Sequence, residues 1–233
     1  MNNEICSLKI LMMSIPKVIY QTFKTKNIPW LTRFYIYRFM KKNPGYKYEF
    51  YDDNRIDDFF KDSFNTRIYR AYRKLQIGAA KADFFRYAVL YKTGGVYLDL
   101  DSDLLVSLDE YLKEDDTAFI AREGPHPFFT QWALVFDKNH PFLERVIEYI
   151  VENIEQNKFP HDVHSLTGPA VYTRAINDVI TENPDVTYRM APDDYRGLMQ
   201  FKYKLCKFLI YKNKSKHWKK LQQRISVLKD DDA

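Results

Sequence analysis

Cysteine is scarce in this chain of 233 residues, which contains only Cys6 and Cys206. Two cysteines so far apart provide neither a disulfide framework nor a cysteine metal site, and this favours a reducing compartment. The sequence also has no run close to the ~20 apolar residues that a membrane-spanning helix needs. The N-terminus lacks the basic start and the long apolar core of a secretory signal. We therefore expect a cytoplasmic protein, which can include one held peripherally at the cytoplasmic face of a membrane.

A strong excess of one charge sign is absent as well. The chain has 36 Lys and Arg against 31 dispersed Asp and Glu, a formal net charge of +5. This balance argues against a nucleic-acid partner, although a basic, aromatic-rich module that binds single strands stays open as a non-enzymatic alternative. A hydrophobic content of 45% excludes a largely disordered chain. The length favours one domain over residues 1–233, with a loosely specified leader at 1–14 and a basic C-terminal segment at 200–233.

The most informative stretch runs from residue 77 to residue 105. Residues 79–91 are good helix formers without Pro or Gly, and a Gly-Gly pair then provides a helix stop. A short β-prone run follows and leads into alternating aspartates. In an extended chain Tyr97, Asp99 and Asp101 would share one face, with neighbouring carboxylates about 7 Å apart. Such carboxylates suit a hard divalent ion, Mn²⁺ or Mg²⁺. An ordinary acidic turn after a strand is the alternative.

A carboxylate and a guanidinium precede this run on the predicted helix. Asp83 and Arg86 are three residues apart and therefore lie on one helical face. The short Gly-Gly connection should bring that face back beside the acidic end of the strand. A carboxylate can bind hydroxyls, while an arginine and a metal ion can bind phosphate oxygens. The combination suits a ligand that carries both hydroxyls and a diphosphate.

These residues carry a family resemblance. The pattern A-x-K-A-D-x-x-R-Y-x-x-L-Y-x-x-G-G-V-Y-L-D-L-D over residues 79–101 resembles the signature of the D-x-D sugar transferases. That group includes the fungal initiating α-1,6-mannosyltransferase, the inositol-phosphoceramide mannosyltransferases and bacterial capsule enzymes, and the pattern is similar to the core of the clostridial glucosylating toxins. The resemblance implies an α/β fold of the GT-A type, with a mostly parallel central sheet flanked by helices.

The resemblance also implies an activity. The expected reaction is a metal-dependent transfer of a hexose, with retention of configuration, from a nucleotide diphosphate sugar to a glycan or glycolipid acceptor. Asp101 would bind Mn²⁺ or Mg²⁺ directly, and Asp99 would bind the ribose or reach the ion through water. Asp83 would hold sugar hydroxyls, and Arg86 would hold the sugar or a phosphate.

Further positions match the family less closely. The donor-binding residues implied by the resemblance come from the opening strand, the strand before the D-x-D, the following strand and a T-G-P loop: Gln21, Thr22, Tyr97, Gln131 and Gly168. A helix that begins at this loop could face the diphosphate, or it could be a plain helix start. His217 could be a further metal ligand, although the surrounding segment keeps only part of the family pattern.

The remaining elements are predicted from local patterns. The expected strands are 16–23, 46–51, 117–122 and 132–137, and the expected helices are 30–42, 55–60 and 142–155. Asp52 and Asp53 are expected to cap the second of these helices. The basic residues of 30–42 could face anionic lipid or nucleic acid, or simply solvent. Eight lysines between residues 201 and 220 predict contact with an anionic membrane; a last helix packed on the domain is the alternative.

A different enzyme class also has a hydrophobic strand that ends in D-x-D. In a haloacid-dehalogenase-like phosphatase Asp99 would be the nucleophile and Asp101 a general acid and base. That class has Thr or Val two places after the second aspartate, where this chain has Asp103. It requires neither the Asp83 and Arg86 helix nor the Gly-Gly pair, so the sequence favours the transferase.

Overall fold

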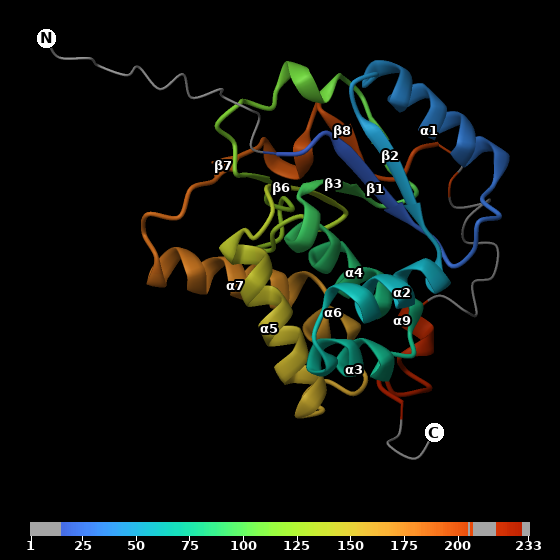
Figure 1. Cartoon of the computed structure of the whole chain (residues 1–233), viewed down its shortest axis with the longest axis vertical. Coiled ribbons are helices and arrows are strands. Elements are labelled where there is room, and N and C mark those ends of the chain that lie inside the picture. The colour runs from blue at the N-terminus through green and yellow to red at the C-terminus, as the bar shows by residue number, and fades with distance from the viewer. Residues whose placement is uncertain (1–14, 205, 207–217, 230–233) are drawn as a thin grey trace, which may run out of the picture.

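The computed structural model describes residues 15–204, 206 and 218–229, and its centre is a six-stranded sheet (Figure 1). The strand order is β2-β1-β3-β6-β5-β7. Neighbours β1/β2, β1/β3 and β5/β7 are parallel, whereas β3/β6 and β5/β6 are antiparallel. The strands of this sheet are β1 Val18–Thr22, β2 Lys47–Tyr51, β3 Gly95–Leu98, β5 Ala118–Ile120, β6 Ala133–Phe136 and β7 Arg189–Met190. The predicted α/β fold with a mostly parallel sheet is confirmed.

A second, two-stranded sheet pairs β4 Asp103–Leu104 with β8 Met199–Gln200. The α-helices that the structure describes are α1 Trp30–Lys42, α2 Asp53–Ser63, α3 Thr66–Lys74, α4 Gly78–Thr93, α5 Pro141–Glu155, α6 Val163–Leu166, α7 Pro169–Glu182 and α9 Trp218–Leu221. Among the described residues no helix combines the length and apolarity needed to cross a bilayer.

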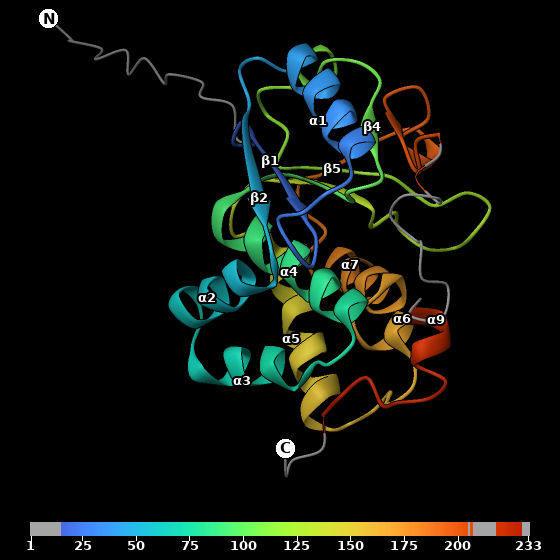
Figure 2. The ribbon, with the colours of Figure 1, turned by 90° about the vertical axis from the view of Figure 1, so that its right-hand side faces the viewer.

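The main sheet separates two hydrophobic layers. Successive side chains of a strand point to opposite faces, and β3 follows this rule: Tyr97 belongs to one apolar cluster, while Val96 and Leu98 belong to the other. The first cluster contains the buried faces of α2 to α7. The second contains Phe39 of α1 and the segments around β4 and β8. Figure 2 shows α1 on one side of the sheet and α2 to α5 on the other.

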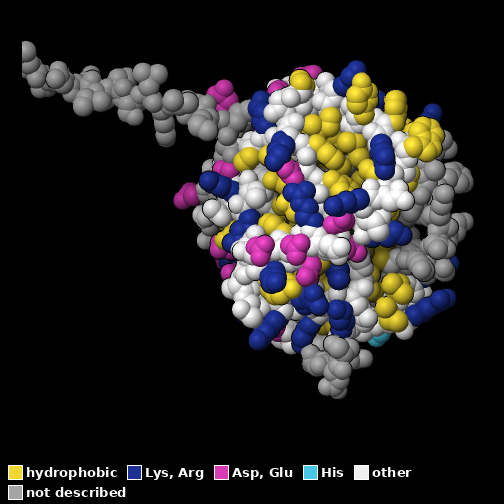
Figure 3. Space-filling model, turned by 45° about the vertical axis from the view of Figure 1, so that its right-hand side comes forward, with side chains coloured by type: hydrophobic (Ala, Val, Ile, Leu, Met, Phe, Trp, Pro, Cys, Tyr) yellow, Lys and Arg dark blue, Asp and Glu magenta, His cyan; other side chains and the backbone are white. Residues whose placement is uncertain are grey.

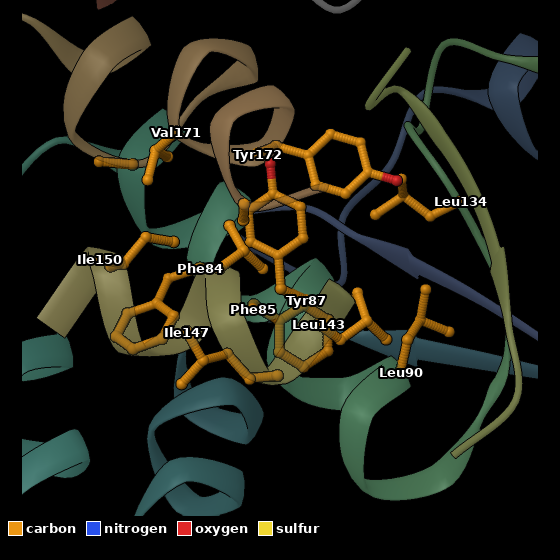
Figure 4. Packing of buried hydrophobic residues seen from close by; sticks show 14 of the residues in the cluster. Phe84, Phe85, Tyr87, Leu90, Leu134, Leu143, Ile147, Ile150, Val171 and Tyr172 are labelled. Atoms are coloured by element: carbon orange, nitrogen blue, oxygen red, sulfur yellow. The ribbon is translucent and has the colours of Figure 1, made fainter. Parts of the chain in front are cut away.

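Helix α4 lies at the middle of the larger layer. Its Phe84, Phe85 and Tyr87 are fully buried and pack among side chains of α5 and α7 (Figure 4). The ring of Tyr87 stacks on Tyr172 of α7, with centroids 5.2 Å apart. Because burial of one such side chain contributes about 1.5–3 kcal/mol, α4 is a rigid platform for the polar residues on its remaining surface.

Two glycines reverse the chain between α4 and β3. Gly94 has φ 64° and Gly95 has φ 114°. Residues other than glycine rarely adopt backbone conformations with such positive φ angles. A Cβ atom on Gly94 would lie 2.7 Å from Pro16 Cδ and 2.9 Å from Lys138 N. From Asp83 to the turn the helix rises about 16 Å, and β3 then returns about 13 Å to Asp99. The two acidic positions therefore meet again at one level.

Most predicted elements are present, with boundaries shifted by a few residues. The helix predicted at 30–42 has the bounds of α1, and the helix predicted at 142–155 is α5. Asp52 caps α2 by accepting a hydrogen bond from Arg55 N at 3.0 Å, as predicted, while Asp53 is the first residue of that helix. Helices α3 and α6 were not predicted.

Candidate active site

The D-x-D motif follows the last residue of β3 and forms a turn. The ladder between β3 and β6 ends at Leu98, and Ser102 N then donates to the Asp99 carbonyl at 2.9 Å. The expectation that Tyr97, Asp99 and Asp101 continue on one extended face is therefore wrong for Asp101, whereas Tyr97 and Asp99 do lie on one side, since their side chains are hydrogen bonded. The chain has to turn here because β4, which starts at Asp103, pairs with β8 rather than with the main sheet.

An ion-pair cluster joins the start of α4 to the end of β3. Arg86 lies 3.0 Å from Asp83 Oδ1 and 3.1 Å from Asp99 Oδ1. The side chains of Arg86 and Asp83 are 6% and 7% exposed, whereas that of Asp99 is 27% exposed. Two geometric predictions are confirmed: Asp83 and Arg86 share one face of the helix, and this face lies beside the acidic end of the strand. Asp99 is the carboxylate of this cluster that solvent reaches most easily.

Neighbouring polar groups hold the cluster in place. Thr167 Oγ1 donates to Asp83 Oδ2 at 3.2 Å, and the Tyr97 hydroxyl donates to Asp99 Oδ1 at 3.1 Å. Arg86 also donates to the Gln131 carbonyl at 2.7 Å. The T-G-P loop thus contacts the cluster at Asp83 through Thr167, and the segment before β6 contacts it at Arg86 through the Gln131 backbone.

The electrostatics of the cluster follow from burial. Burial raises the pKa of Asp83 to about 7, an effect that nearby Asp99 reinforces and that the guanidinium of Arg86 opposes. Burial also raises the pKa of Asp99, against the opposing effects of Arg86 and the Tyr97 hydroxyl. Water contact at Asp99 weakens the effect there. The guanidinium of Arg86 is therefore the group that opposes the rise in the pKa of both carboxyls.

Strand β1 supports the backbone of the D-x-D turn through one of its side chains. Gln21 is fully buried, and its Nε2 donates to the Asp99 carbonyl at 3.1 Å while its Oε1 accepts from the Tyr48 hydroxyl at 3.0 Å. Thr22 Oγ1 donates to the Tyr51 carbonyl at 2.8 Å. In this structure Gln21 positions the backbone of the motif, and Thr22 is bonded to β2.

Gln131 and Gly168 lie on the other side of the cluster. The Gln131 side chain accepts from the Tyr87 hydroxyl at 2.6 Å. Gly168 is the residue before α7, and Pro169 occupies the first turn as the sequence predicts. A Cβ atom on Gly168 would lie 2.8 Å from His164 Cα. Only glycine fits this close approach of the loop to α6 without moving the backbone.

A second ion pair fixes the chain just after the motif, and the sequence reasoning missed it. Asp103 is fully buried and pairs with Arg38 of α1. Asp101 is 3% exposed, and its carbonyl accepts from Tyr203 N at 2.9 Å. The signal available in the sequence was the third aspartate at alternate spacing. Its partner lies 65 residues away and could not be found from local pattern.

Comparison with known proteins identifies this constellation. Residues 29–118 match the family described as "Glycosyltransferase sugar-binding region containing DXD motif". Over 186 residues the chain is 33% identical to "Uncharacterized glycosyltransferase L373" of Acanthamoeba polyphaga mimivirus. The matched region covers 73% of this chain and 68% of that protein. The chain belongs to the DXD glycosyltransferase family. This membership decides against the phosphatase alternative.

Two further proteins resemble this glycosyltransferase, one in sequence and one in structure. It is 31% identical over 159 residues to "Inositol phosphoceramide mannosyltransferase 3" of Schizosaccharomyces pombe, and the match covers 67% of this chain but 43% of that protein. The solved structure "Crystal structure of the UDP-bound glycosyltransferase domain from the YGT toxin" has a TM-score of 0.57 at 10% identity, with 80% of each chain covered. The latter likeness supports the GT-A fold.

The donor set of this glycosyltransferase fits a hard divalent ion. Within residues 15–204, 206 and 218–229 no three His, Cys, Asp or Glu side chains converge as a metal site. A magnesium-like ion in a phosphate-transfer site commonly takes only one or two protein carboxylates, and substrate phosphates and water fill its other positions. The carboxylates of Asp99 and Asp101 are of the chemical type that such an ion takes; the Asp99 side chain is 27% exposed, whereas Asp101 is 3% exposed.

His217, the predicted further metal ligand, lies outside the described residues. The same holds for Lys212, Lys214 and Lys216 of the basic C-terminal segment. Their roles in metal binding and in contact with an anionic membrane stay predictions, as does the cytoplasmic location.

Proposed function

We propose that this glycosyltransferase transfers a hexose from a nucleoside diphosphate sugar to a hydroxyl of a glycan or glycolipid, with retention of configuration and with Mn²⁺ or Mg²⁺ bound. The observation that carries the proposal is the Asp83–Arg86–Asp99 cluster at the end of β3, which includes the first aspartate of the D-x-D turn. It presents anionic and cationic groups of fixed geometry at the edge of the sheet where ligands of open α/β folds bind. The printed name of the fungal relative supports a mannosyl donor and a lipid-linked acceptor.

Each residue of the cluster has a chemical task in this proposal. Asp83 and Asp99 hold the Arg86 guanidinium at 3.0 and 3.1 Å, so its planar donors are oriented before the substrate arrives. Asp99, the more exposed carboxylate, binds the ribose or a water of the ion. A bound divalent ion supplies neutralisation of the charge that develops on the departing diphosphate.

Asp101 is the direct metal ligand in the proposal, and this role requires a rearrangement. Asp101 is 3% exposed, whereas a carboxylate that would hold a metal ion beside the donor diphosphate has to face the substrate. We infer that the turn at residues 99–102 changes when the donor binds. The hydrogen bond from Tyr203 N to the Asp101 carbonyl, 2.9 Å long, is one contact that restrains this turn.

Donor hydrolysis tests the proposal. The purified protein is supplied with UDP-glucose, UDP-galactose, UDP-N-acetyl sugars or GDP-mannose in the presence of Mn²⁺, and release of the nucleoside diphosphate is measured. One donor should be turned over in preference to the others, and EDTA should abolish the reaction. Asp101→Asn should lower the rate at least ~100-fold, as loss of a strong electrostatic contact commonly does.

A matched control separates this effect from a general change of charge. Asp185→Asn removes one carboxylate from an exposed position after α7 and should leave the rate unchanged. Full turnover by protein verified to be metal-free would show the metal assignment to be wrong. Phosphorylation of Asp99 by a phosphomonoester substrate would overturn the transferase mechanism.

A further inference from the structure

The outer face of α1 is an unusually exposed aromatic surface. Trp30, Phe34 and Tyr37 are 73%, 52% and 56% exposed. Their spacing of four and three residues places them on one side of a helix, and the buried Thr32 and Phe39 lie on the opposite side. Single exposed apolar residues are ordinary on a protein surface, but a contiguous patch of large ones marks an interaction site.

Basic side chains accompany these rings, and acidic ones are absent from the surrounding sequence. Arg33 and Lys41 are exposed within the same stripe, and Lys41 Nζ lies 4.9 Å from the centre of the Tyr37 ring. Between residues 15 and 48 the sequence contains eight Lys or Arg and no Asp or Glu. Figure 3 shows hydrophobic and basic side chains together over the upper part of the molecule, where α1 lies in Figures 1 and 2.

We propose that this face of α1, the aromatic stripe of Trp30, Arg33, Phe34, Tyr37 and Lys41, docks on an anionic lipid bilayer. Trp and Tyr favour the boundary between headgroups and hydrocarbon. Lys and Arg are attracted by the negative surface potential, and their long stems let the charge stay in water while the stem lies on apolar surface. A helix with this composition on one side lies in the plane of the interface.

The shape of the stripe favours a bilayer over a single-stranded nucleic acid. Single strands are bound in positively charged grooves, where bases stack on aromatic rings. The rings of α1 instead stand on the convex outside of a helix whose other side packs against the sheet. A convex ridge of aromatic and basic side chains can enter a flat interface along its whole length.

The inner side of α1 connects this surface to the D-x-D turn. Arg38 pairs with Asp103, Lys42 Nζ donates to the Leu105 carbonyl at 2.5 Å, and the hydroxyls of Thr32 and Tyr203 are hydrogen bonded at 2.5 Å. A docked α1 would therefore hold the segment after the motif at a fixed distance from the bilayer. If the acceptor is lipid-linked, this distance would bring the D-x-D turn to the acceptor at the bilayer. That step rests on the proposed function, whereas the docking of α1 does not.

Vesicle binding by the whole chain tests the docking without any sugar donor. Vesicles of phosphatidylcholine with phosphatidylserine are compared with vesicles of phosphatidylcholine alone, at low and high salt. The protein should sediment with the anionic vesicles, and high salt should weaken this binding because it screens exposed charges. Arg33→Glu with Lys41→Glu should weaken it at least about tenfold, since each basic residue near such a surface contributes about a factor of five.

A variant with the same change of net charge provides the control. Arg70→Glu with Lys158→Glu alters exposed positions on α3 and after α5, on the side of the molecule away from α1 in Figure 1, and should bind like the unmodified protein. Equal weakening by both double variants would overturn the proposal, because the binding would then depend on total charge alone.

The fluorescence of Trp30 reports whether α1 itself enters the interface. Of the three tryptophans, Trp30 is 73% exposed, Trp132 is 6% exposed and Trp218 is half-buried, so docking of α1 on anionic vesicles should shift the Trp30 emission to shorter wavelength. Trp30→Phe keeps an aromatic ring and should bind vesicles while losing this shift. Three outcomes would each overturn the proposal. The emission shift could persist in Trp30→Phe, or vesicle binding could be lost only when the charges of Lys212, Lys214 and Lys216 are reversed. The third is no binding to anionic vesicles at low salt. The proposal would also be overturned if the protein bound a single-stranded oligonucleotide as tightly as anionic vesicles and the Arg33→Glu with Lys41→Glu variant lost that oligonucleotide binding.

Discussion

Replacement of Arg86 by methionine would leave two neighbouring carboxylates without their cation while keeping a side chain of similar length. Arg86 lies 3.0 Å from Asp83 and 3.1 Å from Asp99, and its side chain is 6% exposed. Removal of one partner from a buried ion pair costs about 3–5 kcal/mol because the remaining charge stays buried. We expect the loss in the free energy of unfolding to reach this size at pH 8.5 and to be smaller at pH 7, where Asp83 can take up a proton.

The loss should depend on pH in a defined direction. The pKa of Asp83 is about 7 in the folded protein, above its ordinary value of 3.8. The folded state therefore binds the proton more tightly, and stability falls as the pH rises between these two values and then levels off. Without the guanidinium, which lowers this pKa, the decline continues beyond pH 7. At about 1.4 kcal/mol per pH unit, the variant should lose about 2 kcal/mol more than the unmodified protein between pH 7 and pH 8.5.

Urea unfolding of both proteins at pH 6, 7 and 8.5 measures this difference. The double variant Asp83→Asn with Arg86→Met is the control, because it has no Asp83 carboxyl to titrate and should show a smaller dependence on pH. An Arg86→Met cost that is the same at pH 7 and pH 8.5 would refute the reasoning. A double variant as pH-sensitive as Arg86→Met would refute the assignment to Asp83.

Three other substitutions test separate parts of the structure. Gly95→Ala places a Cβ atom 2.8 Å from the Val18 carbonyl at a φ of 114° and should reduce the free energy of unfolding in urea by about 1–3 kcal/mol. Tyr97→Phe removes the hydroxyl that lowers the pKa of Asp99, so the acidic limb of the pH profile of donor hydrolysis should move to higher pH; an unchanged limb would exclude Asp99 as the titrating group. Asp52→Ala removes the cap of α2 and should cost ~1 kcal/mol in the same unfolding assay.

The parts of the fold that local spacing controls were predictable. The stop at Asn43, followed by Pro and Gly, predicted the end of α1. The spacing of Asp83 and Arg86 predicted that they share one face of a helix, since positions three apart on a helix are neighbours; the ion pair between them is a finding of the structure. Both inferences need only a few consecutive residues and the geometry of one helix.

The parts that depend on distant segments were not predictable. An extended D-x-D was expected because alternation continues along an isolated strand, but the end of β3 is decided by its pairing with β6 and by the pairing of β4 with β8. The ion pair of Asp103 with Arg38 joins residues 65 positions apart. The burial of Asp101 also follows from segments that approach it in space, including Tyr203.

The return of β3 beside α4 makes the number of residues along this stretch critical for the site. A residue inserted between Arg86 and Gly94 would rotate the preceding helical face by about 100° and shift it by about 1.5 Å, which turns Asp83 and Arg86 away from Asp99. A residue inserted into β3 would exchange the two sides of the strand, so that Tyr97 would face the other hydrophobic layer. A change of even one residue in its length separates the charged groups that the folded chain brings together.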